Sequence, residues 1–372
     1  MSKPKRVSER LSIRGKGVTR VLIINQERIP HYRIGVYNYL SEYLKNDNIA
    51  LTVVSGGIDQ GGSYKISFDY NEISLTILNL IRVILRIKSD VIIFWVKLSN
   101  LYLFPILLIA KILGKKAIYW GHGYDLYGKN AKKKKFANNI QYWLSDALIL
   151  YGEHLKKNVS KQFHNKIFVA NNTIYFGDYD NKSLDKGKCL AKYNITTTNN
   201  IIYMGRMEKR KKLEDLFEAF KLIGRKDVGL ILVGPDTGGV LGGVCCDNVY
   251  KLGAIYGNER LDLLSAADVF CLPGAVGLSI VDAFFCGLPI VTEDGAESPE
   301  IMYLKEGVNG FIVPKGDVQQ LAARLQLLLE DEEMREHFSH EAKKEIMTNG
   351  HINIMCKGFS DALQFVSTKR QN

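Results

Sequence analysis

The chain has 372 residues, of which 46% are hydrophobic and 24% charged, a composition that indicates about two folded domains and excludes general disorder. Its net charge of +11 is unevenly distributed, because residues 1–178 carry 27 Lys and Arg against 12 Asp and Glu, and residues 179–372 carry 23 against 27. The basic first half predicts an anionic partner: nucleic acid, lipid headgroups or a phosphorylated ligand.

Cysteine spacing and hydropathy exclude several further classes of protein. The six cysteines form no CxxC pair and no cluster with histidine, which argues against a disulfide framework and against a zinc site. The basic segment 1–17 lacks the apolar core of a secretory signal, and the most apolar stretch, 101–113, is shorter than the ~20 residues that span a bilayer. We therefore expect a cytoplasmic protein.

The first half alternates short apolar runs, typical of buried strands, with stretches of helical spacing. A flexible basic tail at 1–17 comes first, and Gly35 is expected in the loop after the first strand. We expect strands at 21–25, 51–56, 91–96, 116–123, 166–172 and the end of 137–152, and helices at 36–45, 73–88, 101–114 and the start of 137–152.

The alternation lapses between residues 173 and 200 and then resumes, which predicts a second domain. We expect strands at 201–205, 229–234, 249–253, 268–274, 289–294 and 310–317, and helices at 213–224, 258–267, 279–287, 318–347 and 353–366. The pattern predicts two doubly wound, parallel-sheet α/β domains of Rossmann-like type that face a central cleft, where the carboxyl ends of the strands bind ligands. The expected boundaries are 18–175 and 200–350 for the domains, 176–199 for the junction and 351–372 for a C-terminal helix.

Two segments of the second half have the residue types of an anion site. Arg206 directly follows the strand end at Gly205, and Lys211 lies five residues further on, before a helix. An Arg fork and a Lys point charge suit a diphosphate, although a solvated basic loop explains the same residues.

The second of these segments is a glycine-containing turn, GAVGLS at 274–279, that opens a helix and offers backbone N–H groups to an anion. Asp282, in the first turn of that helix, can accept both hydroxyls of a ribose, or can serve only as a partner of the helix dipole.

Five motifs in order resemble the retaining glycosyltransferases of family 4 (glycosyltransferase group 1), which have the GT-B fold. They are Gly205-Arg206 with Lys211, the ADV segment and proline at 267–273, CGLPIV at 286–291, PEI at 299–301 and GVNGFIV at 307–313. The likeness is strong over 200–355 and weaker at 31–44 and 120–123. It implies a UDP- or GDP-linked sugar donor held mainly by the second domain, transfer with retention of configuration, and a last helix that crosses back to the first domain.

The resemblance also implies roles for individual residues. The catalytic candidates are His122, Arg206 and Lys211; the donor-site candidates add Gly35, Gly205, Val276, Gly277, Leu278, Ser279 and Asp282; Arg33 and Asp125 are candidates for acceptor contact. A lone histidine such as His122, between two glycines at a strand end, is structural more often than functional, and the resemblance shifts the interpretation toward function.

The chain departs from the family at the Glu-x7-Glu motif. Asp282 stands at the second Glu, which binds ribose, but Gly274 stands at the first, which usually contacts the donor sugar. Either another residue orients the sugar, or backbone N–H groups at 276–278 do so, or the site is impaired.

The resemblance implies transfer without a metal. We expect no metal site and no cofactor beyond the nucleotide-sugar substrate. Arg206, Lys211 and helix N-termini would stabilise the leaving group.

The basic first half has two interpretations. Arg82, Arg86 and Lys88 within 77–88, and four lysines at 132–135, would face an anionic membrane if the acceptor were carried on a lipid diphosphate. The alternative is a core-packing helix with a solvated basic stripe. Nucleic acid is not expected, because no binding module for it is present.

We therefore expect a hexosyltransferase-type glycosyltransferase, peripheral on the inner face of the plasma membrane. It would move a sugar from a nucleotide-sugar to a saccharide acceptor, lipid-linked in our expectation, in the biosynthesis of capsule, O-antigen or exopolysaccharide. The alternative is a catalytically silent GT-B protein that acts as a scaffold or partner, which Gly274 suggests. A dinucleotide-dependent oxidoreductase is disfavoured, since no GxGxxG follows the first strand.

Overall fold

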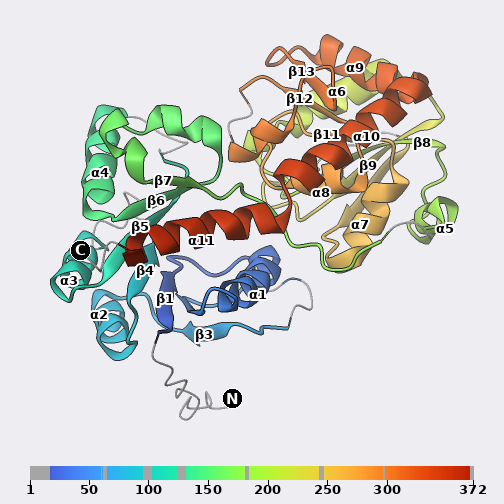
Figure 1. Ribbon diagram of the computed structural model, residues 1–372. Coiled ribbons are helices and arrows are strands. Elements are labelled where there is room, and N and C mark those ends of the chain that lie inside the picture. Colours follow the sequence, from blue (N-terminus) through green and yellow to red (C-terminus); the bar gives the residue numbers. More distant parts are fainter. Residues whose placement is uncertain are drawn as a thin grey trace.

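The computed structural model describes residues 17–59, 61, 65–94, 103–123, 131–180, 184–242, 247–295 and 298–368. These residues form two α/β domains, each built on a parallel sheet, with a long helix running from one to the other (Figure 1). The predicted fold class is confirmed. Asp125 and nearly all of the predicted tail at 1–17 lie outside the described residues.

The N-terminal sheet has the strand order β3-β2-β1-β4-β5-β6-β7. Its strands are β1 (Thr19–Ile24), β2 (Ile49–Ser55), β3 (Asp69–Glu72), β4 (Val91–Phe94), β5 (Lys116–Gly121), β6 (Ala147–Leu150) and β7 (Ile167–Val169), and its helices are α1 (His31–Lys45), α2 (Ile77–Arg86), α3 (Leu103–Ile112) and α4 (Ala131–Leu144). The step from β1 to β2 crosses the sheet in one direction, and the steps from β3 through β6 cross it in the other. Right-handed crossovers therefore place α1 on one face of the sheet and α2, α3 and α4 together on the opposite face.

The C-terminal sheet has the order β10-β9-β8-β11-β12-β13. Its strands are β8 (Asn199–Met204), β9 (Val228–Val233), β10 (Val249–Gly253), β11 (Val269–Cys271), β12 (Ile290–Glu293) and β13 (Gly310–Val313), and the helices of this half are α5 (Lys186–Lys192), α6 (Leu213–Ile223), α7 (Gly257–Ala266), α8 (Ser279–Cys286), α9 (Val318–Glu330) and α10 (Glu332–Asn349). Short 3-10 helices include η2 (Glu153–Asn158) and η3 (Lys161–Lys166) in the first domain and η4 (Lys209–Lys211) and η5 (Pro299–Tyr303) in the second.

The last helix, α11 (Ile352–Thr368), packs in the core of the N-terminal domain, not in that of the domain that precedes it (Figure 1). Tyr39 on α1 donates to the Asn353 carboxamide at 2.6 Å, so a polar contact also joins the two helices. At Gly358 a Cβ would lie 2.1 Å from the carbonyl oxygen of Val169, which shows that the helix backbone lies directly on β7. The chain thus crosses between the domains twice.

Several elements differ from the predictions, each for a local reason. The helix expected at 318–347 is two helices, because Asp331 ends α9 and caps α10 by accepting from the Met334 N–H at 2.9 Å. Helix α5 lies inside the predicted junction, and β3 has a polar sequence with no apolar run.

Gly35 was expected in a loop, but it lies within α1, which already begins at His31. The side chain of Tyr175 packs 3.2 Å from where its Cβ would be, so the absence of a side chain serves close packing and not a turn.

Within the described part of the chain, no helix combines the length and the apolar character needed to cross a membrane.

Candidate functional site

At the carboxyl ends of β8 and β9, the backbones of the residues that follow the two strands lie in close contact. A Cβ on Gly234 would lie 2.0 Å from the carbonyl oxygen of Gly205, whose own φ is +153°. Directly after this contact, the Tyr203 hydroxyl donates to the carbonyl of Arg206 at 2.8 Å and fixes the backbone there. The Arg206 side chain is 64% exposed and has the Glu208 carboxylate 3.4 Å away, so it is an accessible cation at the strand end.

Lys211 is in a different situation from Arg206, although both were predicted to form one cationic pair. Its side chain is 6% exposed, and its ammonium donates to the carbonyl oxygens of Ala275 and, at 3.2 Å, of Val276. Burial first, and the neighbouring Arg210 charge second, lower the pKa of Lys211 to about 8. Lys211 therefore holds the segment 273–278, which we call the glycine loop.

Gly274 is fixed by the packing of the glycine loop against η4. The N–H groups of Gly274 and Ala275 donate to the carbonyls of Lys211 and Arg210, both at 3.1 Å. A Cβ at position 274 would lie 2.2 Å from the Arg210 carbonyl oxygen. With this backbone no side chain fits, so the carboxylate that the family usually has here is excluded by geometry.

A chain of hydrogen bonds ties the other end of the glycine loop to the N-terminal domain. The Gly277 N–H donates to the Ser298 hydroxyl oxygen at 3.1 Å, and that hydroxyl donates to the carboxylate of Glu300. The other carboxylate oxygen accepts from the Asn172 amide, whose oxygen in turn accepts from the Arg33 guanidinium. We call this the interdomain hydrogen-bond chain; it occupies the Gly277 N–H that was predicted to contact the donor.

Arg33 and His122 both lie beside the buried ring of Tyr151. The Arg33 guanidinium carbon is 5.8 Å from the ring centre of Tyr151 and 5.5 Å from that of Trp120, and the His122 ring is 4.8 Å from that of Tyr151. Burial raises the pKa of Tyr151 to about 12, so its hydroxyl stays neutral. Arg33, a predicted acceptor contact, is buried in the N-terminal domain and used by the interdomain hydrogen-bond chain, whereas His122 is half-buried.

Asp282 is part of an ion pair at the start of α8. Its carboxylate lies 3.0 Å from the guanidinium of Arg260 on α7, and both side chains are largely buried. His31, at the start of α1, packs its ring 4.8 Å from that of Tyr256, and burial together with the Arg260 charge lowers the pKa of His31. His31 of the N-terminal domain is thus close enough for the charges of Arg260 and Asp282 to affect its pKa.

Two further predicted donor residues shape the start of α8. Leu278 is the N-cap residue directly before α8, and the Ser279 hydroxyl donates to the Val276 carbonyl at 3.2 Å. Both therefore hold the turn from the glycine loop into the helix.

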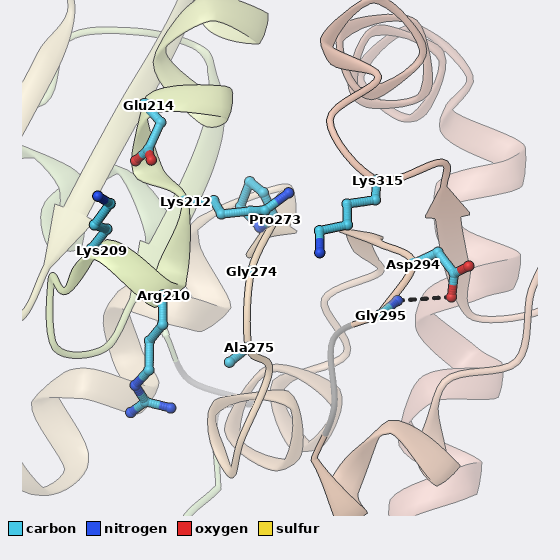
Figure 2. Close-up of a pocket in the computed structure, with 10 residues that line it drawn as sticks. All are labelled: Lys209, Arg210, Lys212, Glu214, Pro273, Gly274, Ala275, Asp294, Gly295 and Lys315. Carbon is cyan, nitrogen blue, oxygen red and sulfur yellow. Dashed lines mark hydrogen bonds between the residues drawn. The ribbon is translucent and has the colours of Figure 1, made fainter. Parts of the chain in front are cut away.

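A cavity of about 400 Å³ lies beside η4 and the glycine loop. Figure 2 shows Lys209, Arg210 and Glu214 on one side and Asp294, Gly295 and Lys315 on the other, with Lys212 and residues 273–275 of the glycine loop between them. Its lining includes the cations Lys209, Arg210, Lys212 and Lys315. The cavity suits an anionic group, yet neither Arg206 nor Lys211 lines it.

The structure thus brings Lys211, Val276 and Gly277 together, and it places Asp282 and His122 in separate contacts. Sequence reasoning missed the roles of Asn172, Ser298 and Glu300. Only the PEI motif drew attention to Glu300, and Asn172 gave no signal. Among the described residues, no group of three or more His, Cys, Asp or Glu is placed to hold a metal ion.

Comparison with known proteins finds a family likeness in the second half of the chain. Residues 185–345 match the family model of the glycosyl transferases group 1. The capsular polysaccharide biosynthesis glycosyltransferase CapM of Staphylococcus aureus is 27% identical over 230 residues, which are 56% of this chain and 58% of CapM. The chain therefore spans little more than half the length of this relative. The predicted resemblance to group 1 glycosyltransferases is confirmed; retention of configuration stays a prediction.

Solved structures extend the likeness in fold to nearly the whole chain. A glycosyltransferase from Rickettsia africae superposes with a TM-score of 0.76 at 16% identity and covers 94% of this chain and 99% of its own. Anabaena Alr3699/HepE, solved in complex with UDP-glucose, gives 0.71 at 16% identity and covers 93% and 99%. The architecture is GT-B.

Proposed function

We propose that the protein is a metal-independent hexosyltransferase that moves a sugar from a UDP- or GDP-linked donor to a saccharide acceptor with retention of configuration. The acceptor would be lipid-linked and the product a surface polysaccharide, made at the inner face of the plasma membrane. The observation that carries the proposal is the group 1 match over 185–345, because that segment contains Arg206, Lys211, the glycine loop and Asp282. The capsular role named for CapM and the UDP-glucose bound to HepE support the substrate classes.

In this proposal the donor diphosphate lies between Arg206 and the N-terminus of α8. Arg206 is the exposed cation that can form a forked contact with phosphate oxygens. Lys211 stabilises the leaving group through the glycine loop that it holds and, when it is protonated, through its charge. His122, half-buried beside Tyr151 at the end of β5, would lie on the sugar side.

The proposal is tested by thermal shift with UDP, GDP and their sugars, using wild-type protein and Arg206→Ala. A nucleotide at ~100 times its dissociation constant should stabilise the wild type by ~2.7 kcal/mol. The variant should keep its melting temperature without ligand, since the side chain is exposed, and lose ~1.5–3 kcal/mol of nucleotide binding. An equal nucleotide shift in both proteins would refute the site assignment.

A second candidate function is a catalytically silent GT-B protein that binds a partner. The closed packing around Gly274 favours it, because the usual carboxylate for the donor sugar has no room there. Release of UDP or GDP from a sugar donor, with or without an acceptor, distinguishes the two: turnover excludes the silent form, and nucleotide binding without turnover supports it.

A further inference from the structure

Helices α2, α3 and α4 expose an unusual number of large apolar side chains. Nine of the fifteen exposed large hydrophobic residues among those the structure describes lie on these helices or directly after α3. They are Ile77, Leu78, Leu85, Leu108, Ile112, Leu113, Phe136, Ile140 and Trp143. Scattered apolar residues on a surface need no explanation, whereas a concentration on three neighbouring helices does.

Each helix arranges these side chains in a stripe. Leu78 and Leu85 are seven residues apart on α2, Leu108 and Ile112 are four apart on α3, and Phe136, Ile140 and Trp143 follow the i, i+4, i+7 spacing on α4. Every helix also has its own buried side, for example Leu80 and Ile84 on α2. The exposed stripes are therefore additional to the apolar sides that pack on the sheet.

The three stripes belong to one surface. Helix α3 packs between α2 and α4, and all three cover the same face of the N-terminal sheet. They lie on the side of this domain that is remote from the C-terminal domain (Figure 1). We call this surface the apolar face. Its most exposed members are Ile112 at 77%, Trp143 at 75%, Phe136 at 69% and Leu78 at 66%.

The charged residues in the sequences of these three helices have one sign. The sequences of α2, α3 and α4 contain seven Lys and Arg and no Asp or Glu. Arg82 lies between Leu78 and Leu85 along the α2 stripe and is exposed, as are Arg86 and Lys88. Asp146, which follows α4, is neutralised by Lys111 at 2.9 Å.

We propose that the apolar face inserts into the headgroup region of an anionic lipid bilayer, with Leu78, Ile112 and Trp143 entering the acyl boundary. Apolar side chains flanked by cations and free of acids are the features that bind helices in the plane of a membrane interface. This specifies the membrane contact named in the proposed function, but it rests on the apolar face alone and does not depend on sugar transfer.

The test is sedimentation of the full-length protein with phosphatidylcholine vesicles, with and without phosphatidylglycerol. The triple variant Leu78→Ser/Ile112→Ser/Trp143→Ser should bind the anionic vesicles at least about tenfold more weakly than the wild type. The matched control is Leu222→Ser, at a leucine that is 58% exposed on α6 in the other domain, and it should bind like the wild type. Arg82→Gln and Arg86→Gln should each weaken anionic binding about fivefold and leave binding to neutral vesicles unchanged.

A second readout keeps the test valid if the triple variant is unstable. The tryptophan fluorescence of the wild type should shift to the blue on anionic vesicles and be quenched by brominated acyl chains, and Trp143→Phe should lose this change. Nucleotide binding measured by thermal shift should be the same in wild type and triple variant, which separates membrane contact from the donor site. Absence of vesicle binding by the wild type, or equal binding by the triple variant, would overturn the proposal. So would a dimer in solution that the triple variant abolishes without any vesicle binding, because the apolar face would then bind a second copy.

Discussion

Restoring the family carboxylate by Gly274→Glu should damage the protein. A Cβ at position 274 would lie 2.2 Å from the Arg210 carbonyl oxygen, whereas real Cβ contacts essentially never fall below 3.0 Å, so the backbones must separate by at least 0.8 Å. Both hydrogen bonds from the glycine loop to η4 are 3.1 Å long and would not survive this movement. Two lost hydrogen bonds at ~1 kcal/mol each and overpacking strain of similar size predict a loss of about 3 kcal/mol in the free energy of unfolding.

The assay is urea unfolding of Gly274→Ala and Gly274→Glu, with Gly187→Ala as the matched control. Gly187 lies in α5, and its Cβ would only make an ordinary 3.5 Å contact with Asp185, so this helical substitution should be neutral or stabilise by up to ~1 kcal/mol. Nucleotide binding should weaken in both variants at 274, because the displaced loop carries the acceptors of Lys211. A stable Gly274→Glu protein with higher transfer activity would refute the argument that packing requires a glycine at position 274.

Two more predictions concern the charges around the glycine loop. Burial lowers the pKa of Lys211 from 10.5 to about 8, so between these two pH values the unfolded state binds more protons than the folded state. The contribution of Lys211 to the free energy of unfolding should therefore rise as the pH increases from about 8 to 10.5. Over the same pH interval the affinity of the protein for a diphosphate should fall, approaching tenfold per pH unit. Calorimetric titration of UDP and GDP should show this fall in the wild type and not in Lys211→Arg, whose charge persists. Glu300→Ala should lower the free energy of unfolding by ~2–4 kcal/mol, because it leaves the buried amide of Asn172 and the hydroxyl of Ser298 without their acceptor; urea unfolding that matches the wild type would contradict the interdomain hydrogen-bond chain.

Local patterns were sufficient for the architecture. Apolar runs of four to six residues, such as β9, and helical spacing, as in α6, depend only on neighbouring residues, and both elements begin within one residue of their predicted starts. Elements fixed by distant contacts were missed. Polar β3 forms because β2 offers it a pairing edge, with Thr52 donating to Asp69 at 2.7 Å across the two strands.

The candidate site likewise has some features that neighbouring residues determine and others that depend on distant contacts. Gly205 and Arg206 could be found because they follow a strand end directly, and Lys211 because it lies shortly before the next helix, but burial decides what each does. Arg206 stays exposed. Lys211 is buried, and its ammonium donates to two carbonyl groups that lie 64 and 65 residues away in the sequence. Asn172 carried no signal, since its role depends on Arg33 and Glu300, which lie 139 and 128 residues away.

The glycine loop is held from two sides by independent contacts. Its first residues lie on η4 through backbone hydrogen bonds that require Gly274, and Gly277 is tied through Ser298 and Glu300 to the N-terminal domain. A loop fixed in this way keeps its backbone groups in place without a side-chain carboxylate, as recognition of a donor sugar by backbone requires. Binding that uses the Gly277 N–H must first take it from Ser298, which would alter the interdomain hydrogen-bond chain. Donor binding in the active form should therefore change the contact between the domains, whereas a silent protein could bind nucleotide through Arg206 and leave that contact intact.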